Sequence, residues 1–248
     1  MTLKARLAAG EALIGTFQKT PSPIVTEVLA LGGLDLVCLD AEHAPFDRLA
    51  IDACCMAARA GGLPLLVRPQ IAAPEHILSA LDCGATGLLL PHIRSVAEAE
   101  AAVRACHYGR GGRGYAGSSR AAGYGGRTIA EHRAASAAQT VVIAQIEDVE
   151  AVDAVDAIAR VPGIDALFVG RIDLSVAMDV PPTAEPVLAA VARVCAAGRV
   201  VGVPVGMFVG DLGEVPRWRE AGATLFLLGS DHGFLLSGAR DLRCAAGF

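Results

Sequence analysis

Eight short apolar segments alternate with eight alanine-rich amphipathic segments along this chain of 248 residues. Each apolar segment is nearly continuous, which is typical of parallel strands covered on both faces. The predicted strands are 12–17, 34–40, 64–69, 86–92, 140–147, 165–170, 200–208 and 224–229. The predicted helices lie near 22–32, 47–61, 74–83, 95–107, 150–160, 184–198, 211–221 and 232–245.

Eight strand–helix repeats favour an α/β fold of the closed (β/α)8 (TIM) barrel type, and the length suits a single domain over residues 1–248. An open doubly wound sheet is the alternative. It usually has fewer repeats and a glycine fingerprint after the first strand, which the segment GTFQKTPSP lacks. Turn glycines typical of helix C-caps precede five strands: Gly32–Gly33, Gly61–Gly62, Gly84, Gly163 and Gly222.

The composition excludes several classes of protein. The net charge of −5 offers no basic field for nucleic acid. The apolar windows are short and broken, so we expect no membrane-spanning helix, and the N-terminus carries no pattern of a signal peptide. Seven cysteines without a CxxC spacing are typical of small core residues in a reducing compartment, so we expect a cytoplasmic protein.

One glycine- and arginine-rich segment, residues 107–127, interrupts the repeat after the fourth strand–helix unit. Its glycine spacing matches neither a Walker loop nor a dinucleotide-binding turn, so it predicts no nucleotide site. It is either a flexible surface loop or, more often for this length, a lid or an oligomer contact.

Polar residues gather at the carboxyl ends of the predicted strands, where such a barrel places its functional groups. They follow five strands: Asp40, Glu42 and His43; Arg68; His92; Gln145 and Glu147; and Asp173. Glu147 and Asp173 follow consecutive strands, so their carboxylates should lie close together and either share a proton or bind a cation. Oxygen ligands favour Mg²⁺ or Mn²⁺. The alternative is a helix N-cap at Asp173 and a solvated rim at Glu147.

Arg68 and His43 are further candidates. Arg68 ends a strand with no other polar side chain, and it would bind a substrate carboxylate or an enolate oxygen, or else form a salt bridge at the rim. Histidine titrates near working pH, so His43 is a candidate general base, or equally a helix N-terminal contact. No lysine follows Lys19, which disfavours a Schiff-base mechanism and leaves metal-assisted carbanion chemistry.

Six segments carry a family resemblance: LDLVCLDAEHAPFD, PLLVRP, LDCGATGLLLPHI, AQIE, VPGIDALFVGRIDLS and GATLFLLGSDHGFL. In this order they resemble the HpcH/HpaI family of metal-dependent 2-oxo-acid aldolases, over nearly the whole chain. The resemblance implies a (β/α)8 barrel and reversible cleavage of a 4-hydroxy-2-oxo acid to an aldehyde and pyruvate or a related 2-oxo acid. It also implies a hexamer built as a trimer of helix-swapped dimers.

The resemblance also implies roles for single residues. Glu147 and Asp173 resemble the ligands of a divalent metal ion (Mg²⁺, Mn²⁺ or Co²⁺), and Arg68 resembles the arginine that stabilises the enolate. His43 resembles the base, acting through water, and Asp82 its acidic partner. Three positions resemble substrate contacts: Gln145, the backbone around Ile172, and Phe208.

Two segments depart from the family pattern. Relatives often have GPxDL where this chain has GRIDL, which places Arg171 at the rim, and RYPPxGxRG where it has HYGRGGRG. The roles of Arg171, Asp40 and Glu42 stay open. Two other functions stay open as well: a lyase for acyl-CoA thioesters of the malyl-CoA or citramalyl-CoA type, and a non-catalytic barrel that binds an acidic ligand.

Overall fold

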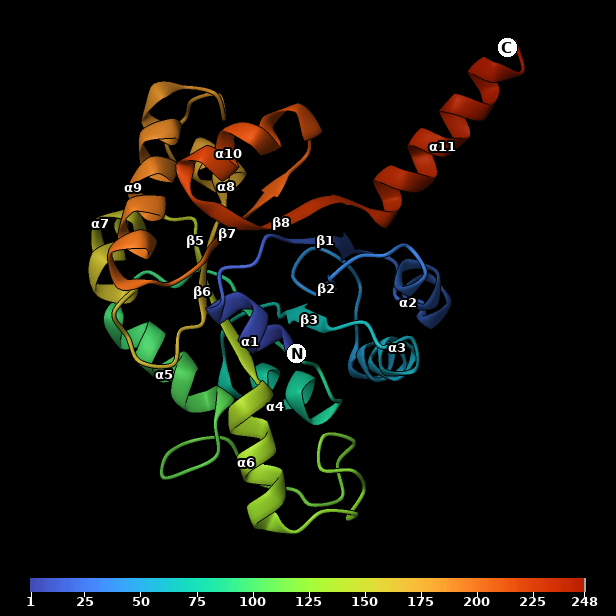
Figure 1. Ribbon diagram of the computed structural model, residues 1–248, viewed down its shortest axis with the longest axis vertical. Coiled ribbons are helices and arrows are strands. Elements are labelled where there is room, and N and C mark those ends of the chain that lie inside the picture. Colours follow the sequence, from blue (N-terminus) through green and yellow to red (C-terminus); the bar gives the residue numbers. More distant parts are fainter. Residues whose placement is uncertain (248) are drawn as a thin grey trace.

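The computed structural model describes residues 1–247, and its eight strands close into a parallel barrel (Figure 1). The strands are β1 (Leu13–Gln18), β2 (Leu36–Asp40), β3 (Leu65–Arg68), β4 (Gly87–Leu90), β5 (Val141–Ile146), β6 (Ala166–Val169), β7 (Val205–Val209) and β8 (Ala223–Ser230). Each strand pairs with its neighbours in sequence, and Gly15 pairs with Leu227 to close the ring between β1 and β8. The predicted (β/α)8 barrel is confirmed.

Helices follow the strands as predicted, with three additions and one shift. The helices are α1 (Leu3–Ala8), α2 (Pro23–Ala30), α3 (Arg48–Ala60), α4 (Pro74–Asp82), α5 (Val96–Cys106), α6 (Ile129–Gln139), α7 (Val149–Ile158), α8 (Arg171–Ala177), α9 (Glu185–Val201), the 3₁₀ helix η1 (Leu212–Glu214), α10 (Val215–Ala221) and α11 (Asp231–Ala245). The sequence did not predict α1, α6 or α8. The predicted strand 200–208 began too early, because α9 runs to Val201 and ends at Gly202, whose φ of 73° is left-handed.

The predicted glycine turns are confirmed by backbone geometry. Five glycines before strands adopt positive φ angles, as a helix C-cap requires: Gly33, Gly62, Gly84, Gly163 and Gly222.

Two apolar cores hold the barrel together. One fills the space between the strands and the surrounding helices, and the other fills the barrel interior, where Leu36, Leu66 and Phe168 meet. Helix α1 closes the base of the interior core with Leu3 and Leu7, which are 3% and 1% exposed. The base is therefore plugged, and the barrel is accessible to a ligand only at the carboxyl ends of its strands.

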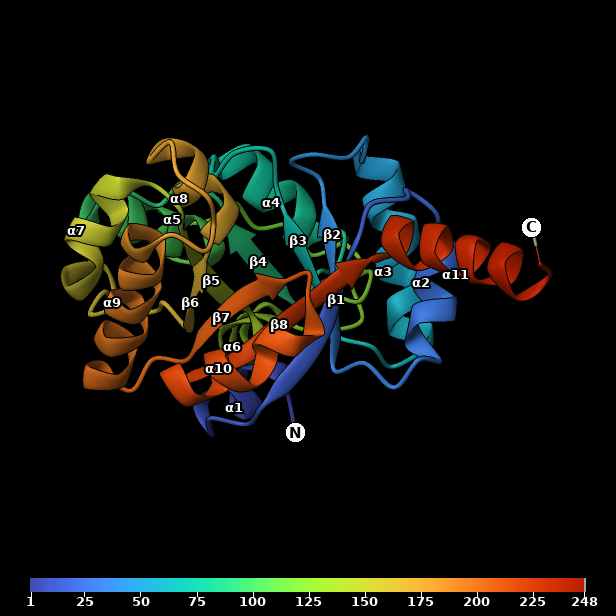
Figure 2. The same cartoon turned by 90° about the horizontal axis from the view of Figure 1, so that it is seen from above.

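Helix α11 departs from the barrel pattern. The predicted helix 232–245 forms, but it extends away from its own barrel instead of covering it (Figures 1 and 2). Asp231 fixes its first turn by accepting hydrogen bonds from the backbone N–H groups of Lys19 and Thr20 at 2.7 and 2.9 Å. Beyond that turn the helix is exposed, including Leu235, Leu236 and Leu242.

The glycine-rich segment lies at the other end of the molecule from the barrel mouth. It connects α5 to α6 and lies with α6 beneath the amino-terminal ends of the strands (Figure 1). It is therefore not a lid over the mouth of its own barrel. Among residues 1–247, no helix is both long enough and apolar enough to cross a membrane.

The plug at the base gives a stability prediction. Replacing Leu7 with alanine should lower the free energy of unfolding by about 2–4 kcal/mol, because it leaves a cavity in the interior core. Leu49 on α3 is 80% exposed, and its replacement by alanine should change that free energy by less than about 0.5 kcal/mol. Denaturant titration followed by circular dichroism measures both, and equal effects would contradict the plug.

Candidate active site

A cavity of about 260 Å³ opens at the carboxyl ends of the strands. Six of the residues predicted for the site line it: His43, Arg68, Gln145, Ile172, Asp173 and Phe208. It is also lined by Phe17, Lys19, Phe168, Val169, Gly170, Arg171 and Ser230. Residues from six strands, together with His43 after β2, thus meet around a space that suits a small organic acid.

Asp40 is the buried partner of Arg68. Its side chain is fully buried, and its Oδ1 accepts hydrogen bonds from Nη2 and Nε of Arg68 at 2.8 and 3.1 Å. Burial acts to raise the pKa of Asp40, but the Arg68 charge and hydrogen bonds outweigh it and the pKa is lowered. The ring of Phe17 lies 4.7 Å below the guanidinium. Arg68 is thereby held rigidly at the wall of the cavity.

Lys19 completes this group of charges. Its ammonium lies 3.2 Å from Oδ2 of Asp40, and it lines the cavity. Asp40 therefore faces two cations, Arg68 and Lys19. Lys19 directly follows β1, so the rule that identified Arg68 at the end of β3 also places Lys19 at the mouth. The sequence prediction for Lys19 was limited to imine formation.

Glu42 lies between Arg68 and two histidines. Its Oε2 is 3.2 Å from Nε of Arg68 and 3.7 Å from Nε2 of His43, and its Oε1 is 3.6 Å from Nε2 of His92. Burial raises the pKa of Glu42, although the three nearby cationic groups oppose that shift. The sequence left the roles of Asp40 and Glu42 open. The carboxylate of Glu42 faces the His43 ring, whereas the carboxylate of Asp40 accepts a hydrogen bond from the His43 backbone N–H at 3.2 Å.

Glu147 directly follows β5 and is buried against Gly170 and Gln145, which line the cavity, but it does not itself line it. Its Oε1 accepts the backbone N–H of His92 at 2.8 Å, and its Oε2 accepts the side-chain amide of Gln145. Burial raises the pKa of Glu147 to about 7, and the charge of Asp173 adds to the shift. A methyl group at Gly170 would lie 2.4 Å from Cβ of Glu147, so only glycine permits this approach.

A second group of ligand atoms adjoins Glu147. His92, Glu147 and Asp148 each offer one such atom within 4.8 Å of the others. Nδ1 of His92 lies 3.0 Å from Asp148 and 3.4 Å from Glu147. Burial acts to lower the pKa of His92, but the hydrogen bond with Asp148 and the neighbouring carboxylates raise it. Asp173 is exposed at the first turn of α8 and lines the cavity from the other side.

Arg171 does not point a free charge into the cavity. Its two terminal nitrogens donate to the carboxylate of Glu214 at 2.8 and 2.6 Å, and the guanidinium lies 5.2 Å from the Trp218 ring. The pair joins α8 to the segment after β7. Glu214 follows a different strand, and nothing in its local sequence pointed to this contact.

Asp82 lies away from this cavity within the chain. It ends α4 on the outside of the barrel, where its charged neighbours are Arg48, Arg113 and His132. Burial raises its pKa, and its Oδ1 is buried without a hydrogen-bond partner. A contact between Asp82 and His43 is therefore not made within one chain.

A closed (β/α)8 barrel whose strand ends bring an arginine, a histidine and an aspartate to one small cavity has the layout of a barrel enzyme's active site. A family model described as HpcH/HpaI aldolase/citrate lyase matches residues 13–237. The chain belongs to this family, and it is a carbon–carbon lyase of the aldolase type.

Individual relatives match over almost the full length. A hydroxypyruvate/pyruvate aldolase of Paraburkholderia phytofirmans is 34% identical over 96% of this chain and 95% of its own. A 5-keto-4-deoxy-D-glucarate aldolase of Salmonella arizonae is 36% identical over 96% and 94%. A solved HpcH/HpaI aldolase/citrate lyase family protein from Burkholderia cenocepacia is 37% identical, with a TM-score of 0.94 over 98% of both chains.

The raised pKa of Glu147 gives a pH prediction for the metal-free protein. The folded state keeps the Glu147 proton up to about pH 7, whereas the unfolded chain releases it near 4.5. Stability should therefore fall as pH rises between these values, by roughly 1–3 kcal/mol. Glu147→Gln should remove this loss of stability with rising pH. Glu220 is exposed, so Glu220→Gln should show the same loss as wild type. Chemical unfolding at pH 5 and pH 8 measures the difference, and parallel profiles for wild type and Glu147→Gln would contradict it.

Proposed function

We propose that the protein is a divalent-metal-dependent aldolase that cleaves a 4-hydroxy-2-oxo acid to an aldehyde and pyruvate or a related 2-oxo acid. The observation that carries the proposal is that Arg68, His43 and Asp173 line one small cavity, while Glu147 is buried in contact with Gln145 and Gly170 of its wall. The named activities of the relatives from Paraburkholderia phytofirmans and Salmonella arizonae support it, because both are aldolases of oxo acids.

The residues at the mouth fit a divalent cation. Glu147 is buried close to the charge of Asp173, which is an unfavourable arrangement without a positive charge. The Oε1 atom of Gln145 is buried without a partner beside them. Carboxylate oxygens suit Mg²⁺, Mn²⁺ or Co²⁺, and we propose Glu147 and Asp173 as the ligands. A cation held there would act as a Lewis acid that polarises the 2-oxo group of the substrate.

Arg68 supplies the fixed positive charge of the reaction. Asp40 and Phe17 hold its guanidinium in place, so little reorganisation is needed when negative charge develops on the substrate. In the cleavage direction, the C3–C4 bond breaks and its electron pair passes to the 2-oxo acid, which becomes an enolate. Arg68 donates to the enolate oxygen, and a proton returned to C3 completes the 2-oxo acid product.

His43 is positioned to move the other proton. Its ring is exposed at the cavity mouth, next to Glu42. It removes the proton of the C4 hydroxyl, through a water molecule, as the C4 carbon becomes the aldehyde carbonyl. Glu42 stabilises the imidazolium that forms. Ile172 and Phe208 form the apolar side of the cavity, against which the acceptor aldehyde packs.

Metal removal tests this function. Chelation should abolish the release of pyruvate from 4-hydroxy-2-oxo acids, and Mg²⁺, Mn²⁺ or Co²⁺ should restore it. The same holds for solvent deuterium exchange into the methyl group of pyruvate, which needs no aldehyde. Metal affinity should fall about tenfold per pH unit below pH 7, because Glu147 must lose a proton to bind. Full activity in metal-free buffer would contradict the proposal, and cleavage of a malyl-CoA thioester alone would favour the other lyase class.

A pair of matched variants identifies the ligands. Glu147→Gln and Asp173→Asn should each weaken Mn²⁺ binding at least tenfold in calorimetric titration. Asp148→Asn is the control, because the carboxylate of Asp148 is already paired with His92 and Arg94. If Asp148→Asn lost the metal and Asp173→Asn kept it, the group of His92, Glu147 and Asp148 would be the metal site instead.

We also propose that the chain assembles with further copies of itself as a hexamer of helix-swapped dimers. The support is α11, which exposes Leu235 and Leu242 one heptad apart on a helix that leaves its own barrel (Figure 2). An apolar stripe of this kind is normally covered. The six buried thiols agree with the cytoplasm as its compartment.

The assembly can be tested on α11 alone. Leu235→Glu combined with Leu242→Glu should reduce the molar mass in light scattering from that of a multimer to that of a smaller species. Arg240→Glu is the control, because Arg240 lies on another face of the same helix. An unchanged mass in the double variant would contradict the role of α11.

A further inference from the structure

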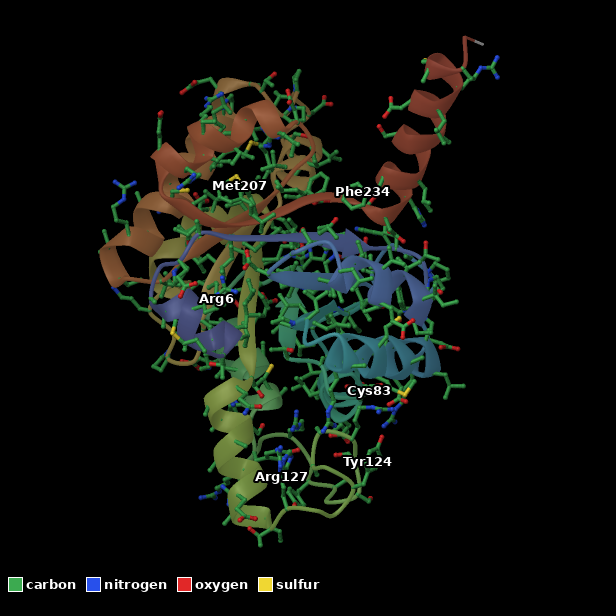
Figure 3. The ribbon with its side chains drawn as sticks, turned by 45° about the vertical axis from the view of Figure 1, so that its right-hand side comes forward. Arg6, Cys83, Tyr124, Arg127, Met207 and Phe234 are labelled. Carbon is green, nitrogen blue, oxygen red and sulfur yellow. The ribbon has the colours of Figure 1, made fainter. Side chains whose placement is uncertain are left out.

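A second cavity, of about 240 Å³, lies at the base of the molecule, opposite the barrel mouth. Its walls come from the end of α3, the turn between α4 and β4, the glycine-rich loop and α6. Figure 3 shows Arg127 between α6 and the remainder of that loop. Neither the family assignment nor the proposed aldolase chemistry uses this cavity.

The lining of this basal cavity is strongly basic for a protein with a net charge of −5. Four arginines and one histidine line it, without any aspartate or glutamate among the lining residues: Arg59, Arg113, Arg120, Arg127 and His132. Ser136, Gln139 and Thr140 add neutral hydrogen-bonding groups to the same wall.

Nearby carboxylates neutralise only part of this charge. Asp52 accepts two hydrogen bonds from Arg120, at 3.1 and 2.6 Å, and Asp82 is the acidic neighbour of Arg113. Within residues 1–247, Arg59, Arg113 and Arg127 have no carboxylate oxygen within 4.0 Å of their nitrogens. Four arginines against the carboxylates of Asp52 and Asp82 leave a net positive charge at the cavity. Arg59 and Arg127 carry it at exposed positions, where it is available to an anion.

Two of the lining side chains are buried and incompletely bonded. Arg113 and His132 are 7% and 3% exposed, and Nε of Arg113 and Nδ1 of His132 have no hydrogen-bond partner within the described chain. The Tyr108 ring fixes both, because it lies 4.1 Å from the Arg113 guanidinium and its hydroxyl lies 3.0 Å from Nε2 of His132. Buried polar groups of this kind are normally satisfied, so they point to a missing partner.

The cavity is also shaped to hold an arginine. Gly84 has a φ of 99°, and a methyl group there would lie 3.1 Å from Cδ of Arg120. Glycine at this turn therefore leaves space for the Arg120 side chain, which then reaches Asp52. The Arg120 guanidinium is consequently held in place by packing and by its ion pair with Asp52.

We propose that this basal cavity binds a small dianion, such as a phosphate group or a dicarboxylate. The forked N–H groups of an arginine can bind the paired oxygens of a phosphate or a carboxylate. The positive charge of the cavity is opposite to the charge of either dianion. The bound anion joins α3, the loop and α6 through Arg59, Arg127 and the His132 wall. It thereby fixes the glycine-rich loop against the barrel, at the amino-terminal end of the strands.

Calorimetric titration of the full-length protein tests the site. The titrants are inorganic phosphate and succinate, in a buffer free of other multivalent anions and with the metal removed. One dianion per chain should bind, and the stronger of the two titrants identifies the source chemistry. Arg59→Gln and Arg127→Gln should each weaken binding about tenfold. Both side chains are exposed, so these variants should fold.

Arg133→Gln is the matched control, because Arg133 follows His132 on α6 but does not line this cavity. It should bind as wild type does.

Trypsin cleavage within residues 107–127, which contain Arg110, Arg113, Arg120 and Arg127, gives a second readout. Phosphate or succinate should slow it in wild type and in Arg133→Gln but not in Arg127→Gln. Absence of binding in wild type would overturn the proposal. Unchanged binding in both Arg59→Gln and Arg127→Gln would also overturn it, because the anion would then occupy another site.

Discussion

The closure of eight parallel strands is the constraint on which the rest of the structure depends. In a closed parallel barrel every strand points the same way, so the residues after each strand meet at one rim. Residues as distant in sequence as Lys19, Arg68 and Phe208 thereby line one cavity. The base is filled by Leu3 and Leu7 of α1, which leaves the rim as the accessible end.

At that rim, burial and neighbouring charges shift the pKa values of the carboxyl groups. Asp40 is fully buried and retains its charge because Arg68 and Lys19 face it. Glu147 has the half-exposed imidazole of His92 at 3.4 Å, but burial outweighs that charge and holds the Glu147 proton up to about pH 7. Two carboxylates within one mouth thus differ in protonation because of their neighbours, which is the arrangement a metal-dependent lyase needs if a cation is to replace the proton.

The two ends of the barrel have different chemistry. The mouth balances arginine and lysine against several carboxylates, whereas the basal cavity gathers arginines with few acidic neighbours. Asp82 belongs to the outer wall near the base, beside Arg113 and His132. Asp82 is thus separated from His43 within one chain, and α11 projects from the barrel.

The sequence by itself determined the barrel, the turn glycines and most of the residues at the mouth. Continuous apolar segments predict parallel strands, and the polar residues at the carboxyl end of each strand can be identified from that strand alone. The tertiary structure alone decided which charges pair. It joined Asp40 to Arg68, Glu42 to the histidines, and Arg171 to Glu214. It also decided that α11 leaves its barrel and that the glycine-rich loop encloses a basic cavity. The physical reason is that periodicity records which face of a segment is apolar, whereas a contact between side chains on different strands depends on where barrel closure places them.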